Sequence, residues 1–380
     1  MDRAVELALI DRCLDHLAAK SPQQSDAVVD SPVTRYTDPA RFRLEQERIF
    51  RRAPQIVAHA SQFSQAGDFV TTTIAGTPVL LIQGKDDRIR AFKNVCRHRG
   101  TLLEAEPSGC RARFQCPYHA WTYMLDGSLA GVPHAPKGFP ELDRTENGLV
   151  PLSTHVGFGF VWVQLDGPPV ESLQAFLGDF AADLEGFDVG SAHLYGEATH
   201  SWEANWKLLA EGGLEAYHFQ VAHEQTISKY FPNNVLIWDR SNDHMRITFP
   251  KLTIAELADK PEEERRLVDH ANVVYNFTPN TAFIHEKDHI VWLRTRPIAV
   301  DRSETTLRFL VPTHPDTWDE QQRKYWRVNF DLTDRTLVED FTLNQSSQRA
   351  IASGANEVFR FGRFEAALAD FNAMIESKLG

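Results

Sequence analysis

The chain has 380 residues, of which 42% are apolar and 24% are charged, and its net charge is −12. These values are ordinary for a globular protein and exclude a disordered, collagen-like or coiled-coil chain. An acidic chain is a poor partner for nucleic acid or for an anionic membrane surface. The composition therefore favours small-molecule chemistry or docking to a basic protein.

The first twenty residues predict an amphipathic helix, because Val5, Leu9, Cys13 and Leu17 recur every four residues. This segment is charged throughout and lacks the apolar core of a signal peptide, and no window resembles a membrane span. Four cysteines are too few for a disulfide framework, so we expect a cytoplasmic protein. A linker rich in Ser, Pro and Asp follows, and residues 1–37 are expected to form an N-terminal helical arm and linker.

Short β-rich runs separated by turn residues follow a short expected helix at 41–51. They predict a small antiparallel β domain over residues 38–165, ended by the turn at 167–169. The expected strands lie at 69–74, 78–82, 89–94, 112–116, 120–124 and 159–164.

The remaining residues, 166–380, mix helical and strand-like patterns and predict an antiparallel sheet covered by helices. The fold class expected for the whole chain is therefore α+β. Helices are expected at 172–185, 208–223, 315–352 and 361–378, and strands at 234–250, 273–284, 289–296 and 305–312.

Two cysteine–histidine pairs stand in turns of the β domain. Cys96 and His98 are two residues apart, and Cys116 and His119 are three residues apart. A structural zinc site is one reading of two thiolates and two imidazoles. Each loop supplies one Cys and one His, however, and this mixed pairing suits a two-iron cluster in which Cys ligates one iron and His the other. Cys110, between the loops, is expected to be a small buried residue.

A predicted helix over 208–223 carries the second group of candidate ligands. Glu211, Glu215 and His218 fall at i, i+4 and i+7 on one stripe of this helix. His223 lies off the stripe, so both imidazoles reach one metal only if the helix ends or bulges between them. Two imidazoles and a carboxylate with open positions describe a mononuclear non-heme iron site. The alternative is an amphipathic helix with solvated glutamates and surface histidines.

Together these segments resemble the α subunits of Rieske non-heme iron oxygenases, the aromatic ring-hydroxylating oxygenase family. The cysteine–histidine loops resemble the Rieske [2Fe–2S] motif, and the run from Asn205 to His223 resembles the catalytic motif. One departure is Gly212, which stands where the family usually has Asn. The resemblance implies a Rieske domain at 38–165 and a helix-grip-like catalytic domain, with mononuclear non-heme iron, at 166–380.

For the cluster, the resemblance implies that Cys96 and Cys116 hold the inner iron and that His98 and His119 hold the outer, redox-active iron. The respiratory Rieske proteins tie their two loops together with a further disulfide. Here Arg99 and Tyr118 stand near the ligands and the loops have no partner cysteines, so that branch is disfavoured.

For the mononuclear iron, the resemblance implies His218 and His223 as ligands. It also implies that Glu215 acts in catalysis, by bridging His218 to the Rieske histidine of a neighbouring subunit. The third ligand should be a carboxylate of the C-terminal helix. Asp340 sits at the family's position and Glu339 is the alternative, because adjacent helical residues point about 100° apart and only one can face the iron.

The resemblance further implies O2 as co-substrate and a homotrimer, in which one subunit's cluster approaches the next subunit's iron. The chain contains no GxGxxG fingerprint of a nicotinamide or flavin site. NAD(P)H would therefore act only through a separate ferredoxin, flavin reductase or both.

The expected function is that of a terminal oxygenase, which uses O2 and two reductase-derived electrons to hydroxylate a small aromatic or alicyclic substrate. One alternative is oxidative N-demethylation or hydroxylation of a quaternary ammonium, betaine-like compound, in which an aromatic cage would matter. An alternative from another class is a Rieske electron-transfer protein without oxygenase activity. The candidate pocket residues are Trp238, Phe249, Tyr275, Phe277 and Phe283, and the alternative for each is plain packing in the core of the sheet.

Overall fold

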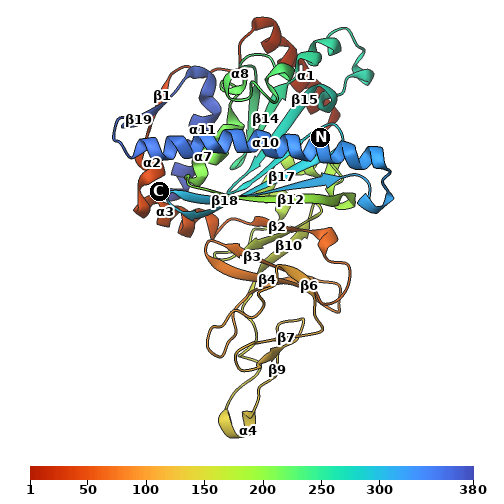
Figure 1. The fold of residues 1–380 in the computed structure, drawn as a ribbon, viewed down its shortest axis with the longest axis vertical. Coiled ribbons are helices and arrows are strands. Elements are labelled where there is room, and N and C mark those ends of the chain that lie inside the picture. Colours follow the sequence, from red (N-terminus) through yellow and green to blue (C-terminus); the bar gives the residue numbers. More distant parts are fainter. The chain divides into compact units, whose positions relative to one another are not determined.

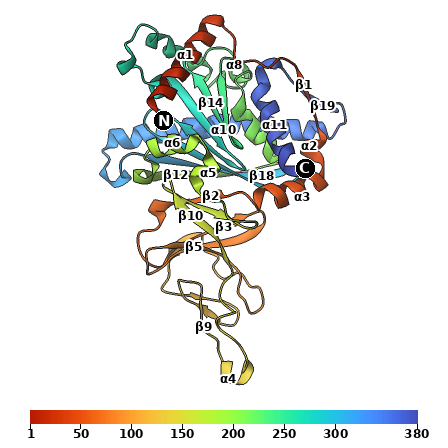
Figure 2. The ribbon, with the colours of Figure 1, turned by 180° about the vertical axis from the view of Figure 1, so that it is seen from behind.

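The computed structural model describes residues 1–380, and the chain forms two compact units. Unit 1 comprises Met1–Ile49 and Gln174–Gly380, and unit 2 comprises Phe50–Leu173. Both units are built on antiparallel sheets and most helices belong to unit 1, so the predicted α+β fold class is confirmed (Figures 1 and 2). None of the helices combines the length and the apolar character needed to cross a bilayer.

Unit 2 contains two antiparallel sheets. The larger has the strand order β2-β11-β10-β5-β4-β3-β6 and the smaller has the order β7-β8-β9. The helix α4 (Ala135–Gly138) lies beyond the smaller sheet at one end of the unit (Figure 1). The strands are β2 (Gln55–His59), β3 (Asp68–Ile74), β4 (Thr77–Gln83), β5 (Ile89–Lys93), β6 (Ser108–Cys110), β7 (Phe114–Gln115), β8 (Thr122–Tyr123), β9 (Leu129–Gly131), β10 (Pro151–Gly157) and β11 (Phe160–Gln164).

Unit 1 is organised around a seven-stranded sheet with the order β12-β18-β17-β16-β15-β14-β13. The runs predicted as single strand-like regions at 234–250 and 273–284 each form a hairpin of two strands. The strands are β12 (His193–Trp202), β13 (Ile237–Ser241), β14 (His244–Pro250), β15 (Ala271–Phe277), β16 (Thr281–His285), β17 (Ile290–Ala299) and β18 (Arg302–Val311).

The helix α10 (Glu320–Ile351) lies across one face of this sheet (Figure 1). It begins at a capping box: the Asp319 side chain accepts from the Gln322 N–H at 2.8 Å, and the Gln322 side chain accepts from the Asp319 N–H at 3.1 Å. On the other face, α6 (Phe180–Gly186) packs against β15 (Figure 2). The other helices are α1 (Arg3–Ala19), α2 (Thr34–Thr37), α3 (Pro39–Glu45), α5 (Leu173–Leu177), α7 (Trp206–Glu211), α8 (Phe219–Ala222), α9 (Leu267–His270) and α11 (Ala366–Leu379).

The N-terminal arm is part of unit 1. The predicted first helix is present as α1, and it buries Leu9, Ile10 and Cys13. The segment expected to be a linker contains β1 (Val29–Pro32), which pairs with β19 (Val358–Phe361), as well as α2. Because α3 also belongs to unit 1, the boundary between the units falls after residue 49, compared with the boundary after residue 37 predicted from the sequence.

Two local predictions are wrong. Cys110 is exposed rather than buried, because β6 is the edge strand of its sheet and pairs only with β3. The helix predicted at 172–185 is two helices, α5 and α6, because Gly178 adopts a left-handed φ of +59° between them.

Candidate metal centres and pocket

Two loops of unit 2, 96–101 and 116–121, share one backbone conformation. In each loop the N–H of the first residue donates to the carbonyl of the last at 2.8 Å. The N–H of the fifth residue, Gly100 or Ala120, donates to the first carbonyl at 3.0 Å. Both of these residues have positive φ angles, +74° and +59°. The chain therefore presents the two Cys–His pairs from equivalent turns.

The side chains of these loops have the character of ligands. Cys96 and Cys116 are buried, and the rings of His98 and His119 lie with centroids 4.6 Å apart. The Nδ1 atoms of both imidazoles are buried without a hydrogen-bond partner. Burial, together with the charges of His119 and Arg99, lowers the pKa of His98 and favours its neutral, ligand form.

The four groups come in two matched pairs, one thiol and one imidazole from each loop. The two unpartnered imidazole nitrogens and two buried thiols therefore fit a binuclear iron–sulfur cluster.

The second candidate segment does not form the single helix predicted at 208–223. The helix α7 ends at Glu211, a short 3₁₀ turn reaches Leu214, and Glu215 is extended with φ −145° and ψ 162°. Two consecutive glycines at 212–213 weaken the helix at this point. The predicted stripe of Glu211, Glu215 and His218 is therefore wrong.

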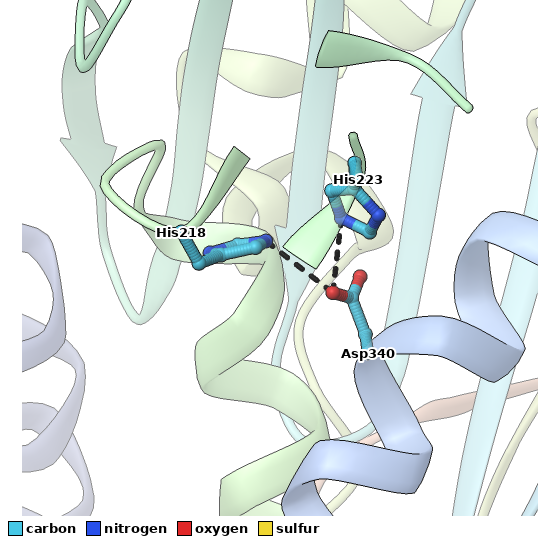
Figure 3. Close-up of side chains that lie close together, drawn as sticks. All are labelled: His218, His223 and Asp340. Atoms are coloured by element: carbon cyan, nitrogen blue, oxygen red, sulfur yellow. Dashed lines mark ion pairs between the residues drawn. The ribbon is translucent and has the colours of Figure 1, made fainter. Parts of the chain in front are cut away.

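The break places His218 and His223 at the two ends of the short helix α8. Asp340 approaches them from α10, and its Oδ1 lies 3.3 Å from His218 Nε2 and 3.0 Å from His223 Nε2 (Figure 3). The structure thus brings together the three residues that the sequence predicts as ligands of one iron.

A further carboxylate stands behind each imidazole. The Glu215 side chain contacts His218 Nδ1 and accepts from the His218 backbone N–H at 3.2 Å. The Oε2 atom of Glu339 lies 2.9 Å from His223 Nδ1 and accepts from the Thr226 hydroxyl at 2.6 Å. With Nδ1 held by a carboxylate, each imidazole directs its Nε2 toward the place where a metal would bind, as in carboxylate–histidine–metal triads. Sequence reasoning considered Glu339 only as an alternative ligand and missed this position behind His223.

The charges of this group fit a divalent cation. Burial by itself lowers the pKa of His218, but the carboxylates of Asp340 and Glu215 outweigh it and raise this pKa to about 10. The same kind of balance, with Asp340 and Glu339, raises the pKa of His223. Three carboxylates thus surround two imidazoles and attract positive charge, which fits the 2-His-1-carboxylate site of Fe(II).

A cavity of about 140 Å³ adjoins His223 and Asp340. Its apolar side includes Phe219, whose ring centroid lies 5.4 Å from that of Phe231 and 5.2 Å from that of Phe249. The polar side consists of asparagines and threonines, and apart from His223 and Asp340 no titratable residue lines the cavity. The lining includes Phe219, Phe231, Phe249, Asn272, Asn276 and Thr295.

Only one of the five pocket residues predicted from the sequence, Phe249, lines this cavity. Strand alternation places Tyr275, Phe277 and Phe283 on the opposite face of the sheet, away from Asn276 and its neighbours. The Trp238 indole donates to Asp370 at 3.1 Å and lies outside the cavity.

Behind the cavity, Glu211 is buried. Its Oε1 accepts hydrogen bonds from the Tyr36 hydroxyl and the Asn372 amide, both at 2.8 Å. Burial raises the pKa of Glu211 to about 7, although these hydrogen bonds lower it. The residue therefore supports the fold from behind the pocket and has no contact with the three metal-facing side chains.

This pKa predicts a loss of stability with rising pH. The folded-state pKa of Glu211 lies above its ordinary value, so its stabilising contribution is full below pH 4.5 and is lost as the pH rises through about 7. We expect the free energy of unfolding to fall by about 1–3 kcal/mol from this group between pH 5 and pH 8.5. Glu211→Gln should remove most of this dependence, and Glu203→Gln, an exposed control, should keep it. Urea unfolding at both pH values measures the difference; equal pH dependence in both variants would contradict the assignment.

Comparison with known proteins gives consistent matches. Residues 189–380 match the family described as "Ring hydroxylating alpha subunit (catalytic domain)", and residues 53–151 match "Rieske [2Fe-2S] domain". The chain is 31% identical over 240 residues to the glycine betaine monooxygenase oxygenase subunit of Pseudomonas aeruginosa (strain UCBPP-PA14), covering 62% of this chain and 53% of the relative. It is 33% identical over 198 residues to the anthranilate 1,2-dioxygenase large subunit of Acinetobacter baylyi, covering 51% of this chain and 42% of the relative.

The chain thus spans about half the length of these two curated relatives. Its fold is similar to the crystal structure of the quaternary ammonium Rieske monooxygenase CntA in complex with an inhibitor, with a TM-score of 0.80 and 24% identity. The superposition covers 93% of this chain and 96% of CntA.

Proposed function

Because the chain belongs to the family of ring-hydroxylating oxygenase α subunits, we propose that it is a terminal oxygenase that hydroxylates a small organic molecule with O2 and two reductase-derived electrons. When bound, a [2Fe–2S] cluster and Fe(II) supply electron storage and the O2-reactive metal. NAD(P)H serves this reaction only through a separate ferredoxin, flavin reductase or both. The observation that carries the proposal is the cavity beside His223 and Asp340, in the same unit as the candidate iron site.

In this proposal the four residues Cys96, His98, Cys116 and His119 hold the cluster, and His218, His223 and Asp340 hold the mononuclear iron. Glu215 and Glu339 orient the two imidazoles through their Nδ1 atoms. A protein that only transfers electrons would have no use for this second group or for the cavity beside it. The oxygenase therefore accounts for more of the chain than an electron-transfer protein does.

The cavity favours a neutral, ring-bearing substrate. Its size is that of a cavity that holds one benzene-sized molecule. Aromatic rings on one side can stack against a substrate ring, and no Lys, Arg or Glu lines the cavity to pair with a charged substrate. Burying an unpaired charge there would be costly, so we place aromatic or alicyclic compounds first.

A quaternary ammonium compound is the second candidate. Relatives named as glycine betaine and carnitine monooxygenase subunits favour it. The rings of Phe219, Phe231 and Phe249 offer cation–π contacts to N-methyl groups. Such a substrate would be demethylated or hydroxylated next to the bound iron.

A single-turnover experiment separates the two candidates without the natural reductase. The purified holoprotein is reduced chemically and then exposed to O2 with phenol, toluene, cyclohexanol, choline, glycine betaine or carnitine. We expect hydroxylated product from the ring compounds. Product from the ammonium compounds alone would select the second candidate, and reduction followed by no product from any of these compounds would contradict the present substrate assignment.

We further propose a homotrimer whose contact surface includes the outer side of the iron site. Three large apolar side chains are exposed there, with Val221 at 83%, Tyr217 at 57% and Leu343 at 52% exposure. Val221 and Leu343 also border a surface hollow with His218 and Glu339. Exposed apolar residues gathered at one place are typical of a subunit contact.

This proposal predicts that Val221→Asp together with Leu343→Asp dissociates the trimer, because two carboxylates would be buried in an apolar contact. Analytical ultracentrifugation should show a shift from about three chains to one. Val328→Asp, at an exposed apolar residue elsewhere on α10, serves as the control and should leave the mass unchanged. A trimer that persists in the double variant would place the contact elsewhere.

A further inference from the structure

One wall of the cavity carries a buried carboxamide with no partner in the chain. Strand alternation on β15 places Asn272, Val274 and Asn276 on the cavity face. Asn276 is only 8% exposed, and its side chain makes no hydrogen bond with any other residue. Folded proteins pair nearly all buried polar groups, so this amide is suited to a bound molecule.

A hydroxyl on β17 is likewise nearly buried and lacks a hydrogen-bond partner. Thr295 is 7% exposed and lines the cavity, and its backbone N–H donates to the carbonyl of Asn280 at 2.8 Å. Its hydroxyl has no partner in the chain. Asn276 pairs with Ala282 on β16, which pairs with Leu293 on β17, so Thr295 lies two residues along β17 from the position level with Asn276. Both residues line the same cavity.

Two neighbouring polar side chains of the cavity donate hydrogen bonds within the chain, whereas the Asn272 Oδ1 and Thr281 hydroxyl oxygens are themselves fully buried without a partner. The Thr336 hydroxyl donates to the Leu332 carbonyl at 2.9 Å, and the Asn272 amide donates to Glu286 at 2.6 Å. Asn276 and Thr295 differ from Thr336 in making no side-chain hydrogen bond within the chain, and both keep some exposed surface, whereas the free oxygens of Asn272 and Thr281 are fully buried.

The chemistry of this pair selects the group that it binds. A carboxamide and a hydroxyl each donate and accept hydrogen bonds, and neither carries charge. A carboxylate would only accept hydrogen bonds, and an ammonium group would only donate them. Neither charged group would find a counter-charge in this wall. The best match is a neutral substituent that both donates and accepts, such as a hydroxyl or a primary amide.

We propose that Asn276 and Thr295 form a specificity subsite for a hydroxyl or carboxamide substituent on the substrate ring. This inference rests on the proposed oxidation of a ring compound in the same cavity. Holding the substituent on the sheet side fixes which ring carbons face His223 and Asp340 on the other side of the cavity. Asn276 and Thr295 thus determine which substrates bind and in what orientation.

Anaerobic calorimetry with the reduced holoprotein tests the subsite by binding rather than turnover. Phenol and toluene are nearly isosteric, and only phenol carries the hydroxyl. In Asn276→Leu we expect the ratio of the toluene Kd to the phenol Kd to fall about 10-fold, because the hydroxyl loses its partner. Thr295→Val should lower the same ratio, and Thr336→Val, whose hydroxyl is already paired, should leave it unchanged.

Retained toluene binding and an unchanged cluster spectrum show that each variant is folded. A ratio that stays unchanged in both Asn276→Leu and Thr295→Val would overturn the subsite while leaving a ring-oxidising enzyme in place. Failure of the unaltered protein to bind either ring compound would overturn the subsite together with the proposed substrate class. The two failures are therefore distinguishable.

Discussion

Asp340→Ala should abolish oxygenation by removing the mononuclear iron, while the visible spectrum of the cluster stays intact. Asp340 is the only carboxylate on the Nε2 side of both His218 and His223, at 3.3 and 3.0 Å. Losing an outer partner of a metal ligand costs about 10–100-fold in metal affinity, and losing the ligand itself should cost roughly 100-fold or more. Iron analysis, visible absorption and single-turnover product formation measure the three parts of this result.

Two further variants on α10 bracket this result, the first as a control and the second as an intermediate case. Asp334→Ala removes a carboxylate of the same helix that pairs with His200 at 2.7 Å, and it should keep both metals. Glu339→Gln should weaken iron binding by about 10–100-fold without eliminating it, because it loosens His223 from behind. Loss of cluster absorbance in Asp340→Ala, with the other iron retained, would show that Asp340 has been given the wrong role.

Glu215→Gln should retain both metals, with the mononuclear iron bound more weakly as in Glu339→Gln, and should slow electron delivery by roughly 10–100-fold. The carboxylate of Glu215 contacts His218 Nδ1 and accepts from the backbone N–H groups of Tyr217 and His218. Glutamine preserves the length of the side chain but removes the charge that orients His218 and, in the proposed trimer, faces the neighbouring cluster. Stopped-flow measurement of cluster reoxidation, with substrate and O2 present, reports the rate directly.

Glu224→Gln serves as the matched control, because Glu224 is an exposed glutamate of the same segment. The hydrogen bonds to the Nδ1 atoms of His218 and His223 come from Glu215 and Glu339, so the Glu224 side chain stands outside this network. The control variant should therefore reoxidise its cluster at the unaltered rate. Unchanged reoxidation in Glu215→Gln would contradict a role for Glu215 in electron delivery, and loss of the mononuclear iron in that variant would instead assign Glu215 to metal retention.

The parts of the site that the sequence could predict depend on short stretches of chain. The resemblance to the oxygenase family is confirmed by the family matches over residues 53–151 and 189–380. The loops 96–101 and 116–121 each close on themselves through backbone hydrogen bonds, so their spacing is a local property of the sequence. The pairing of His218 with His223 is local as well, because one short helix separates them.

The parts that could not be predicted depend on long-range pairing. Whether Tyr275 or Asn276 faces the cavity is decided by which face of the sheet α10 covers, and a one-residue change of register would exchange them. The end of α7 did have a local signal that the predicted helix at 208–223 overlooked, because glycines 212 and 213 are weak helix formers. The exposure of Cys110 follows from the position of β6 at a sheet edge, which local sequence does not contain.

The two adjacent carboxylates of α10 have a consequence for how the protein acquires its iron. Glu339 lies at Nδ1 of His223 and Asp340 lies at Nε2, so one imidazole is held at both ring nitrogens by a single rigid helix. A ring held in this way cannot rotate freely when the metal leaves, and little conformational entropy is lost when it returns. The apoprotein should therefore keep its coordination geometry, and iron removed by a chelator should reload by simple addition of Fe(II), without unfolding and refolding of the chain.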